Sequence, residues 1–160
     1  MWLYSADYVI NEPEHEVHNK DANELISEIE GDILYMDPPY NHRQYGANYH
    51  MLNTIALYDD FQPAGKTGLR AYERSRWCVT NEVSKVFADL IKKAKFKYIV
   101  LSYNNEGLMN IQQVEKIMES YGNYHLIQQP YQRFKADKTE NRNHKATETM
   151  EYLHVLEKRG

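Results

Sequence analysis

The chain has 160 residues, of which 42% are hydrophobic and 26% charged, as is typical of one globular domain with an apolar core. No apolar run approaches the roughly 20 residues that cross a bilayer, the first residues lack a basic and apolar leader, and Cys78 is the single cysteine. We therefore expect a cytoplasmic protein without a membrane-spanning helix, a signal peptide or a disulfide framework.

Hydrophobic periodicity and chain breakers predict the elements in chain order. The expected helices are 22–29, 48–58, 81–94 and 111–121, and Thr80 or Asn81 is expected to cap the third. The expected strands are 32–36, 96–101, 124–132 and 149–156. The segments 61–76 and 135–147 are expected to be mobile loops, because they are polar or rich in glycine and proline.

The net charge of −4 is unevenly distributed. Residues 1–32 carry a net charge of −8, and the remaining residues carry +4. Basic residues gather in 61–76 and 132–145, where they could meet a phosphate backbone. Solvated loops have a similar composition, so charge alone leaves both explanations open.

The alternation of helices and strands predicts one α/β domain over residues 1–160, with a mostly parallel sheet that ends in an antiparallel hairpin. Ligands of such sheets bind beyond the carboxyl ends of the strands. Two polar segments directly follow predicted strands, namely 37–40 (DPPY) and 102–107 (SYNNEG). We expect these segments to lie side by side on one rim of the sheet.

The DPPY segment has the chemistry of a binding turn. Its two prolines fix φ and remove two N–H donors, so the preceding strand must end and a rigid turn remains. This turn presents the Asp37 carboxylate, backbone carbonyls and the Tyr40 ring. Such acceptors can hold an exocyclic amine, while an aromatic ring can stack on a base that has left its duplex. The segment therefore predicts a site for an amino group on a planar heterocycle.

A family resemblance extends this interpretation. The stretch 32–59 (DILYMDPPYNHRQYGANYHMLNTIALYD) resembles the catalytic region of D12-class adenine-specific DNA methyltransferases. The segment 18–26 (HNKDANELI) is similar to the part of that family whose acidic residue meets the cofactor adenosine. The segment 101–107 (LSYNNEG) resembles the family motif that helps to build the base pocket, and 134–158 resembles the closing hairpin. The resemblance runs from about residue 14 to the end of the chain.

This resemblance implies a Rossmann-like fold that moves a methyl group from S-adenosylmethionine to adenine N6 in double-stranded DNA, as in restriction–modification. Asp37 would accept a hydrogen bond from the target amino group, the Pro38 carbonyl would accept the second, Pro39 would keep the turn rigid and Tyr40 would stack on the base. Asp21, Ala22 and Asp37 would contact the cofactor. The residues expected to face DNA are Arg43, Gln44, Tyr45, Asn48, Tyr49, Tyr103, Asn104 and Asn105.

The chain also departs from the family pattern. No glycine-rich loop follows an early strand to hold the methionine part of the cofactor, because the seven glycines are scattered. We therefore expect the first strands of the fold to be missing, which leaves an open sheet edge for an N-terminal methyltransferase fragment or a second copy. The alternatives are a split-enzyme subunit, a truncated or degenerate DNA-binding remnant, and transfer to cytosine N4 or to an RNA or protein nitrogen.

Two further residue types have simpler explanations. His15 and His18 are three residues apart, but no cysteine lies near them and the segment is acidic, so we expect surface histidines and no metal site. Cys78 follows Trp77 and is expected to be a small buried residue rather than a nucleophile.

Overall fold

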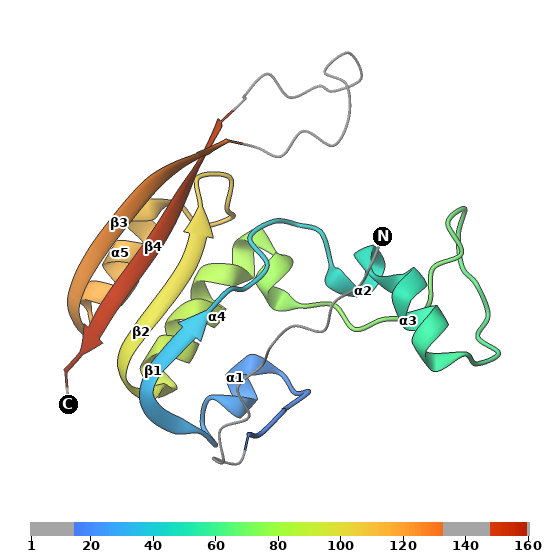
Figure 1. The fold of residues 1–160 in the computed structure, drawn as a ribbon, viewed down its shortest axis with the longest axis horizontal. Coiled ribbons are helices and arrows are strands. Elements are labelled where there is room, and N and C mark those ends of the chain that lie inside the picture. Colours follow the sequence, from blue (N-terminus) through green and yellow to red (C-terminus); the bar gives the residue numbers. More distant parts are fainter. Residues whose placement is uncertain (1–14, 133–147, 160) are drawn as a thin grey trace, which may run out of the picture.

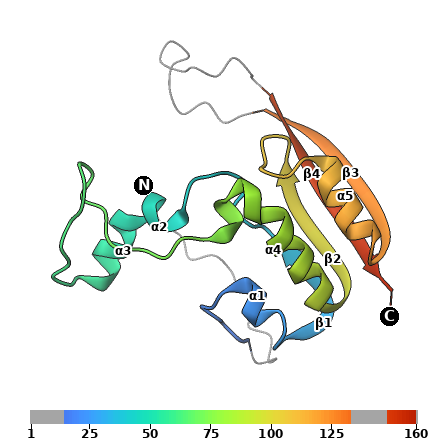
Figure 2. The same ribbon diagram turned by 180° about the vertical axis from the view of Figure 1, so that it is seen from behind.

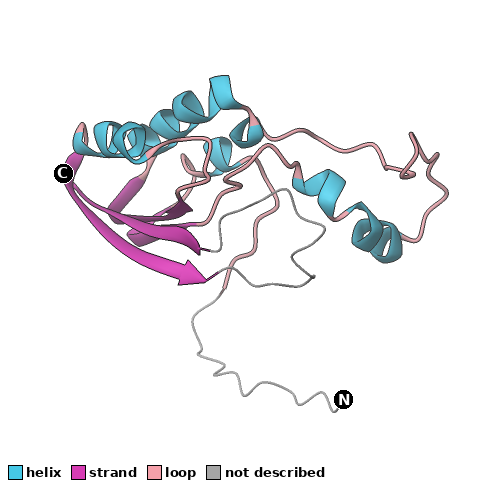
Figure 3. Cartoon of the chain, turned by 90° about the horizontal axis from the view of Figure 1, so that it is seen from above, coloured by secondary structure: helices cyan, strands magenta, loops and turns pink. Residues whose placement is uncertain are grey.

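The computed structural model describes residues 15–132 and 148–159. Four strands form one sheet, and helices pack along one of its faces (Figure 1, Figure 3). The strands are β1 (Glu30–Met36), β2 (Lys95–Asn104), β3 (Gly122–Gln132) and β4 (Glu148–Lys158). The helices are α1 (Ala22–Leu25), α2 (Tyr45–Asn48), α3 (His50–Leu57), the 3₁₀ helix η1 (Arg76–Cys78), α4 (Thr80–Lys93) and α5 (Ile111–Glu119).

The strand order in the sheet is β1-β2-β4-β3. β1 pairs in parallel with β2, with Met36 opposite Leu101, while β4 pairs antiparallel with both β2 and β3. The predicted α/β class and the closing hairpin of β3 and β4 are confirmed. The predicted mostly parallel sheet is wrong, because β4 folds back between β2 and β3 and replaces a parallel contact by two antiparallel ones.

Several element bounds differ from the prediction. The first helix stops after one turn, at Leu25, and the chain turns before β1 begins. The expected helix 48–58 corresponds to α3, and one further helical turn, α2, precedes it and was not predicted. Val79 precedes α4 without a side-chain cap, so the predicted cap by Thr80 or Asn81 is wrong. β2 continues to Asn104, so the first half of the segment 102–107 is strand rather than turn.

The apolar core lies between the sheet and α4. Leu34 and Met36 of β1 pair with Ile99 and Leu101 of β2, so alternate residues of both strands point toward the helices. From α4 the buried residues are Val83, Val86, Phe87, Leu90 and Ile91. Each such side chain contributes roughly 1.5–3 kcal/mol of hydrophobic stabilisation. This packing fixes the carboxyl end of β1, where the DPPY segment begins.

The opposite face of the sheet is open in the part of the chain that the structure describes. Ile33 and Tyr35 of β1 are 64% and 62% exposed, and Ile127 of β3 is 57% exposed. β1 is also an edge strand, because β2 is its one neighbour in the described sheet. An uncovered apolar face beside an open edge is a surface on which another layer or strand can pack.

Residues 41–75, which we call the arm, extend away from the sheet beyond β1 (Figure 1, Figure 2). The arm holds α2, α3 and a loop in which Ala64 and Leu69 form one isolated bridge. Its base is closed by the side-chain amide of Gln44, which donates from Nε2 to the Ser75 carbonyl at 3.1 Å and accepts from the Ser75 N–H at 2.7 Å. The mobility of 61–76 stays a prediction, and the predicted loop 135–147 lies outside the described residues.

No helix in the described ranges is long and apolar enough to cross a membrane.

Candidate functional site

The structure brings the two predicted rim segments together. Because Met36 pairs with Leu101, β1 and β2 end side by side. The Tyr40 carbonyl then accepts a hydrogen bond from the backbone N–H of Leu108 at 2.9 Å. The predicted adjacency of 37–40 and 102–107 is confirmed, and the DPPY turn is attached to the loop that follows β2.

An aromatic contact supports this turn. The rings of Tyr40 and Tyr103 meet edge to face with centroids 6.5 Å apart. Tyr103 is buried, and its hydroxyl accepts a hydrogen bond from the Met109 N–H at 3.3 Å. A Cβ at Gly107 would stand 2.0 Å from the Tyr103 ring, so the close approach of this loop requires glycine. Burial raises the pKa of Tyr103, so its hydroxyl stays protonated in the position behind Tyr40.

Asn104 and Asn105 have structural contacts in this loop. The Asn104 side chain is buried, and its Oδ1 accepts from the Glu106 N–H at 3.0 Å. The Asn105 Oδ1 accepts from the Met150 N–H at 3.2 Å, which joins the loop to β4. Both amides therefore shape the rim, and their predicted contact with DNA stays a prediction.

A cavity of about 600 Å³ lies beside the DPPY turn, and we call it the rim cavity. One wall is the segment before and within α1, a second is the end of β1 with the DPPY turn, and a third is the segment that leads into η1. Its lining residues include Lys20, Asp21, Ala22, Ile26, Leu34, Met36, Asp37, Pro38, Pro39, Arg74, Ser75 and Trp77. The three residues predicted to contact a cofactor, Asp21, Ala22 and Asp37, thus line one cavity.

The Asp21 carboxylate is oriented by the helix that it caps. Its Oδ1 accepts from the backbone N–H groups of Asn23 at 2.8 Å and Glu24 at 3.3 Å. The second oxygen of the carboxylate keeps its acceptor capacity. Asp37 is exposed at the other side of the cavity, directly after β1. The cavity therefore combines apolar walls with carboxylates from two separate elements.

The residues predicted to face DNA separate into two groups in the arm. Arg43, Asn48, Tyr45 and Tyr49 are exposed, and the two tyrosine rings meet edge to face with centroids 5.6 Å apart. The pKa of Tyr45, at the start of α2, is raised by burial and, next, by the Asp37 carboxylate. Gln44, in contrast, uses its whole amide to bind Ser75.

Sequence reasoning missed the third wall of the rim cavity. In the sequence, Glu73, Arg74 and Ser75 belonged to an expected mobile loop with a basic cluster, and Trp77 was noted only as a neighbour of Cys78. Trp77 is buried with its ring edge to face against Phe87, at a centroid distance of 6.2 Å. No spacing in the sequence indicates this wall, because a fold-back of more than 30 residues brings it to β1. Cys78 is buried, as predicted.

Among the described residues, no group of three or more histidine, cysteine or acidic side chains is arranged to hold a metal ion. His18 contacts Glu16 instead, with 3.0 Å between Nε2 and Oε2.

Comparison with known proteins gives the family. Residues 3–117 match the family described as D12 class N6 adenine-specific DNA methyltransferase. The chain is 63% identical over 156 residues to the type II methyltransferase M.NlaIII of Neisseria lactamica, and 42% identical over 161 residues to the type II methyltransferase M.FokI of Planomicrobium okeanokoites. Each match includes 98% of this chain, but it spans 47% of the first relative and 24% of the second. With its DPPY turn at the rim and a family match over most of its length, the chain belongs to the D12 class of N6 adenine-specific DNA methyltransferases.

Proposed function

We propose that this chain is the catalytic portion of an enzyme that transfers a methyl group from S-adenosylmethionine to adenine N6 in double-stranded DNA. The observation that carries the proposal is the rim cavity, in which Asp21 of the α1 wall and Asp37 of the DPPY turn line one space. A DNA substrate and a single cysteine without a disulfide favour action in the cytoplasm.

The rim cavity fits S-adenosylmethionine in size and in donor set. Its volume of about 600 Å³ lies in the usual range for small-molecule sites. Apolar walls from Ile26, Leu34 and Trp77 suit a planar adenine, while the carboxylates of Asp21 and Asp37 suit hydroxyl, amine and cationic groups. Asp21 and Ala22 would hold the adenosine end, and Asp37 would lie toward the reacting end. The bound cofactor would supply the electrophilic methyl group.

The DPPY turn would orient the target amine. The adenine must leave the duplex to reach it, because its N6 is otherwise paired within the stack. Asp37 would accept one N–H of the amine and the Pro38 carbonyl would accept the other, which turns the nitrogen lone pair toward the methyl donor. Pro39 would keep the turn rigid, and Tyr40, supported from behind by Tyr103, would stack on the base. Catalysis would then rest on positioning and on stabilising the positive charge that develops on nitrogen.

The arm would contact the DNA. Arg43 is exposed three residues after the DPPY turn, and its guanidinium would contact a phosphate of the target strand. Tyr45, Asn48 and Tyr49 would extend this surface, while Gln44 would set the direction of the arm. From the neighbouring loop, Tyr103, Asn104 and Asn105 would complete the base pocket mainly by shaping it.

We propose that the active enzyme also contains a methyltransferase segment like the one that the relatives carry outside the matched span. Two features support this proposal. The relative M.NlaIII is about twice as long as the span that it shares with this chain. The open face with Ile33 and Tyr35, and the free edge of β1, offer the surfaces that such a segment would cover. A second copy of this chain on the same surface is the competing arrangement.

Calorimetry with S-adenosylmethionine tests the proposal, on the chain alone and with the unmatched segment of M.NlaIII added. We expect binding under at least one of these two conditions. We expect Asp37→Ala to retain most of the binding while adenine methylation is lost. Glu119→Ala, an exposed acid on α5 far from the rim, is the matched control and should leave both unchanged. Absence of cofactor binding under both conditions would favour the non-catalytic, DNA-binding alternative.

A further inference from the structure

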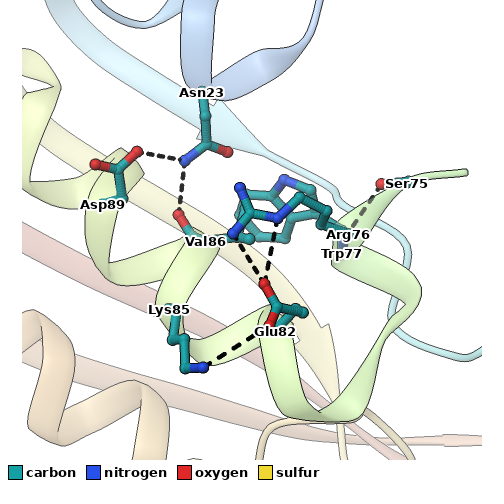
Figure 4. A network of polar contacts seen from close by, with 8 residues as sticks. All are labelled: Asn23, Ser75, Arg76, Trp77, Glu82, Lys85, Val86 and Asp89. Carbon is teal, nitrogen blue, oxygen red and sulfur yellow. Dashed lines mark hydrogen bonds and ion pairs between the residues drawn. The ribbon is translucent and has the colours of Figure 1, made fainter.

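Asn23 is the second residue of α1, and it joins the rim cavity to α4 without lining the cavity itself (Figure 4). We propose that Asn23 is a positioning residue that holds the Asp21 wall in place for the cofactor. This inference rests on the proposed function, because it assigns a role toward the ligand of the same site.

The side chain of Asn23 attaches α1 to α4. Its Nδ2 donates one hydrogen bond to the Val86 carbonyl at 2.8 Å and one to the Asp89 carboxylate at 2.9 Å (Figure 4). A helix of one turn is not stable by itself in water, because the conformational entropy lost in ordering the first turn exceeds the stabilisation from its few hydrogen bonds. α4 has 14 residues and a buried apolar side, so it provides the fixed partner.

The backbone of the same residue holds the ligand-facing group. The Asn23 N–H donates to Asp21 Oδ1 at 2.8 Å. Asn23 therefore connects α4, through its side chain, with the Asp21 carboxylate, through its backbone. A shift of this residue would move the carboxylate that faces the cavity.

The two groups that Asn23 meets are both acceptors, a carbonyl and a carboxylate. An amide NH₂ offers two donors for them, whereas aspartate, leucine or alanine offers none. Its own Oδ1 is buried and has no hydrogen-bond partner in the described part of the chain, so the residue acts through its donors alone. Asp89 is held in turn by Lys93, with 2.7 Å between Nζ and Oδ2, which keeps the acceptor ionised and in place.

α4 also carries the opposite wall of the rim cavity. Arg76 of η1 donates to Glu82 of α4, with Nη2 to Oε2 at 2.9 Å, and Lys85 lies 3.7 Å from the same carboxylate (Figure 4). The Asp21 wall and the Ser75–Trp77 wall are therefore attached to the same helix. The width of the cavity depends on both attachments, and Asn23 provides the one on the Asp21 side.

Three variants test the assignment. Asn23→Asp keeps the shape but removes both donors and places a carboxylate against Asp89. The double variant Asn23→Asp with Asp89→Asn reverses donor and acceptor and restores one of the two hydrogen bonds. Asn81→Asp makes the same chemical change at an exposed position of α4 and serves as the matched control. The readouts are the Kd of S-adenosylmethionine, the separate kcat and KM of methylation, and hydrogen exchange of the α1 amides without ligand.

We expect Asn23→Asp to raise the Kd and KM for S-adenosylmethionine about tenfold, with kcat at saturating cofactor within about twofold of the original. The α1 amides should exchange faster while those of β2 stay protected, and the double variant should recover part of the affinity. An unchanged Kd in Asn23→Asp, beside a wild-type chain that binds, would overturn the positioning role alone. A wild-type chain that binds no cofactor, either alone or with the unmatched segment of M.NlaIII added, would overturn the proposed function and this inference together.

Discussion

The body of the molecule, made of the sheet with α4 and α5, and the arm of residues 41–75 are held together by different forces. The body contains the buried apolar side chains, among them Phe87, Ile91, Ile99 and Leu101. In the arm, α2 and α3 contain no buried residue, and Met51, Leu52, Ile55 and Leu57 of α3 are each at least 60% exposed. What holds the base of the arm is polar, namely the paired hydrogen bonds of Gln44 with Ser75.

This difference indicates where stability and function can be changed separately. Substitutions in the body remove buried area and should act on the free energy of unfolding. Substitutions in the arm remove little buried area and should act on what the arm contacts. The rim cavity lies between the two regions, with Leu90 from the body and Ser75 from the base of the arm among its lining residues.

The strongest test of the comparison is a matched pair of truncations. Phe87→Ala empties a fully buried position against Trp77, so it should lower the free energy of unfolding by about 3–5 kcal/mol. Ile55→Ala removes an exposed apolar side chain from α3 and should change the free energy of unfolding by less than about 0.5 kcal/mol. Denaturant unfolding of both variants measures the difference. Equal losses of unfolding free energy in the two variants would mean that α3 is buried in solution, and this result would contradict the contrast between the body and the arm.

Lys158 tests whether polar contacts also stabilise the body. Its Nζ donates to the carbonyls of Ile91 at 2.9 Å, Lys92 at 3.1 Å and Ala94 at 2.5 Å, at the C-terminal end of α4. Lys158→Met keeps the apolar stem and should cost about 2 kcal/mol in the free energy of unfolding. Lys95→Met, an exposed lysine next to this helix end, is the control and should be neutral.

His154 gives the body a pH dependence. It is fully buried, its Nδ1 lies 2.7 Å from the Tyr124 hydroxyl, and burial lowers its pKa from the ordinary 6.5 to about 4. Between these values the unfolded chain takes up a proton that the folded chain does not, so stability falls as the pH drops from 6.5 toward 4. The loss at pH 5 should be about 2 kcal/mol. His154→Gln keeps an acceptor for Tyr124 and should remove this part of the pH dependence in unfolding experiments.

The sequence allowed prediction of the body more fully than of the arm, for a physical reason. Periodic apolar residues such as Val83, Val86 and Phe87 determine α4, and the apolar run before Asp37 determines β1, because burial selects one face in each case. The order of the strands was not predicted, since the insertion of β4 between β2 and β3 depends on long-range pairing. The short helix α2 was not predicted, because it buries no apolar face that would give a periodic signal.

For the site, the rim position of Asp37 and its neighbours followed from chain order, since two strands that end together bring their following residues together. The wall with Arg74, Ser75 and Trp77 did not follow, because it returns to the rim through the arm. Asn23 escaped notice for a different reason. Its role depends on a contact with Asp89, 66 residues away, which no local pattern encodes.

Gln44 tests the base of the arm. Gln44→Leu removes both hydrogen bonds to Ser75 and should lower the free energy of unfolding by only about 1 kcal/mol. Because the arm would contact DNA, the same change should lower kcat/KM for DNA about tenfold. Steady-state kinetics at saturating cofactor, with Gln113→Leu on α5 as a same-type substitution away from the arm, measures the effect. Unchanged DNA kinetics would show that the direction of the arm is set elsewhere.

Arg43 should have the smallest effect on the fold and a specific effect on binding. Its side chain is exposed, so Arg43→Ala should leave the thermal midpoint unchanged. If the guanidinium meets a phosphate, DNA affinity should fall uniformly across sequences, and the slope of log affinity against log salt should decrease by about one. Lys66→Ala, an exposed cation farther along the arm, separates a specific contact from general charge. Equal salt-dependence slopes for the two variants would assign the change in DNA affinity to net charge. The arm would then contact its partner through its exposed apolar side chains rather than through Arg43.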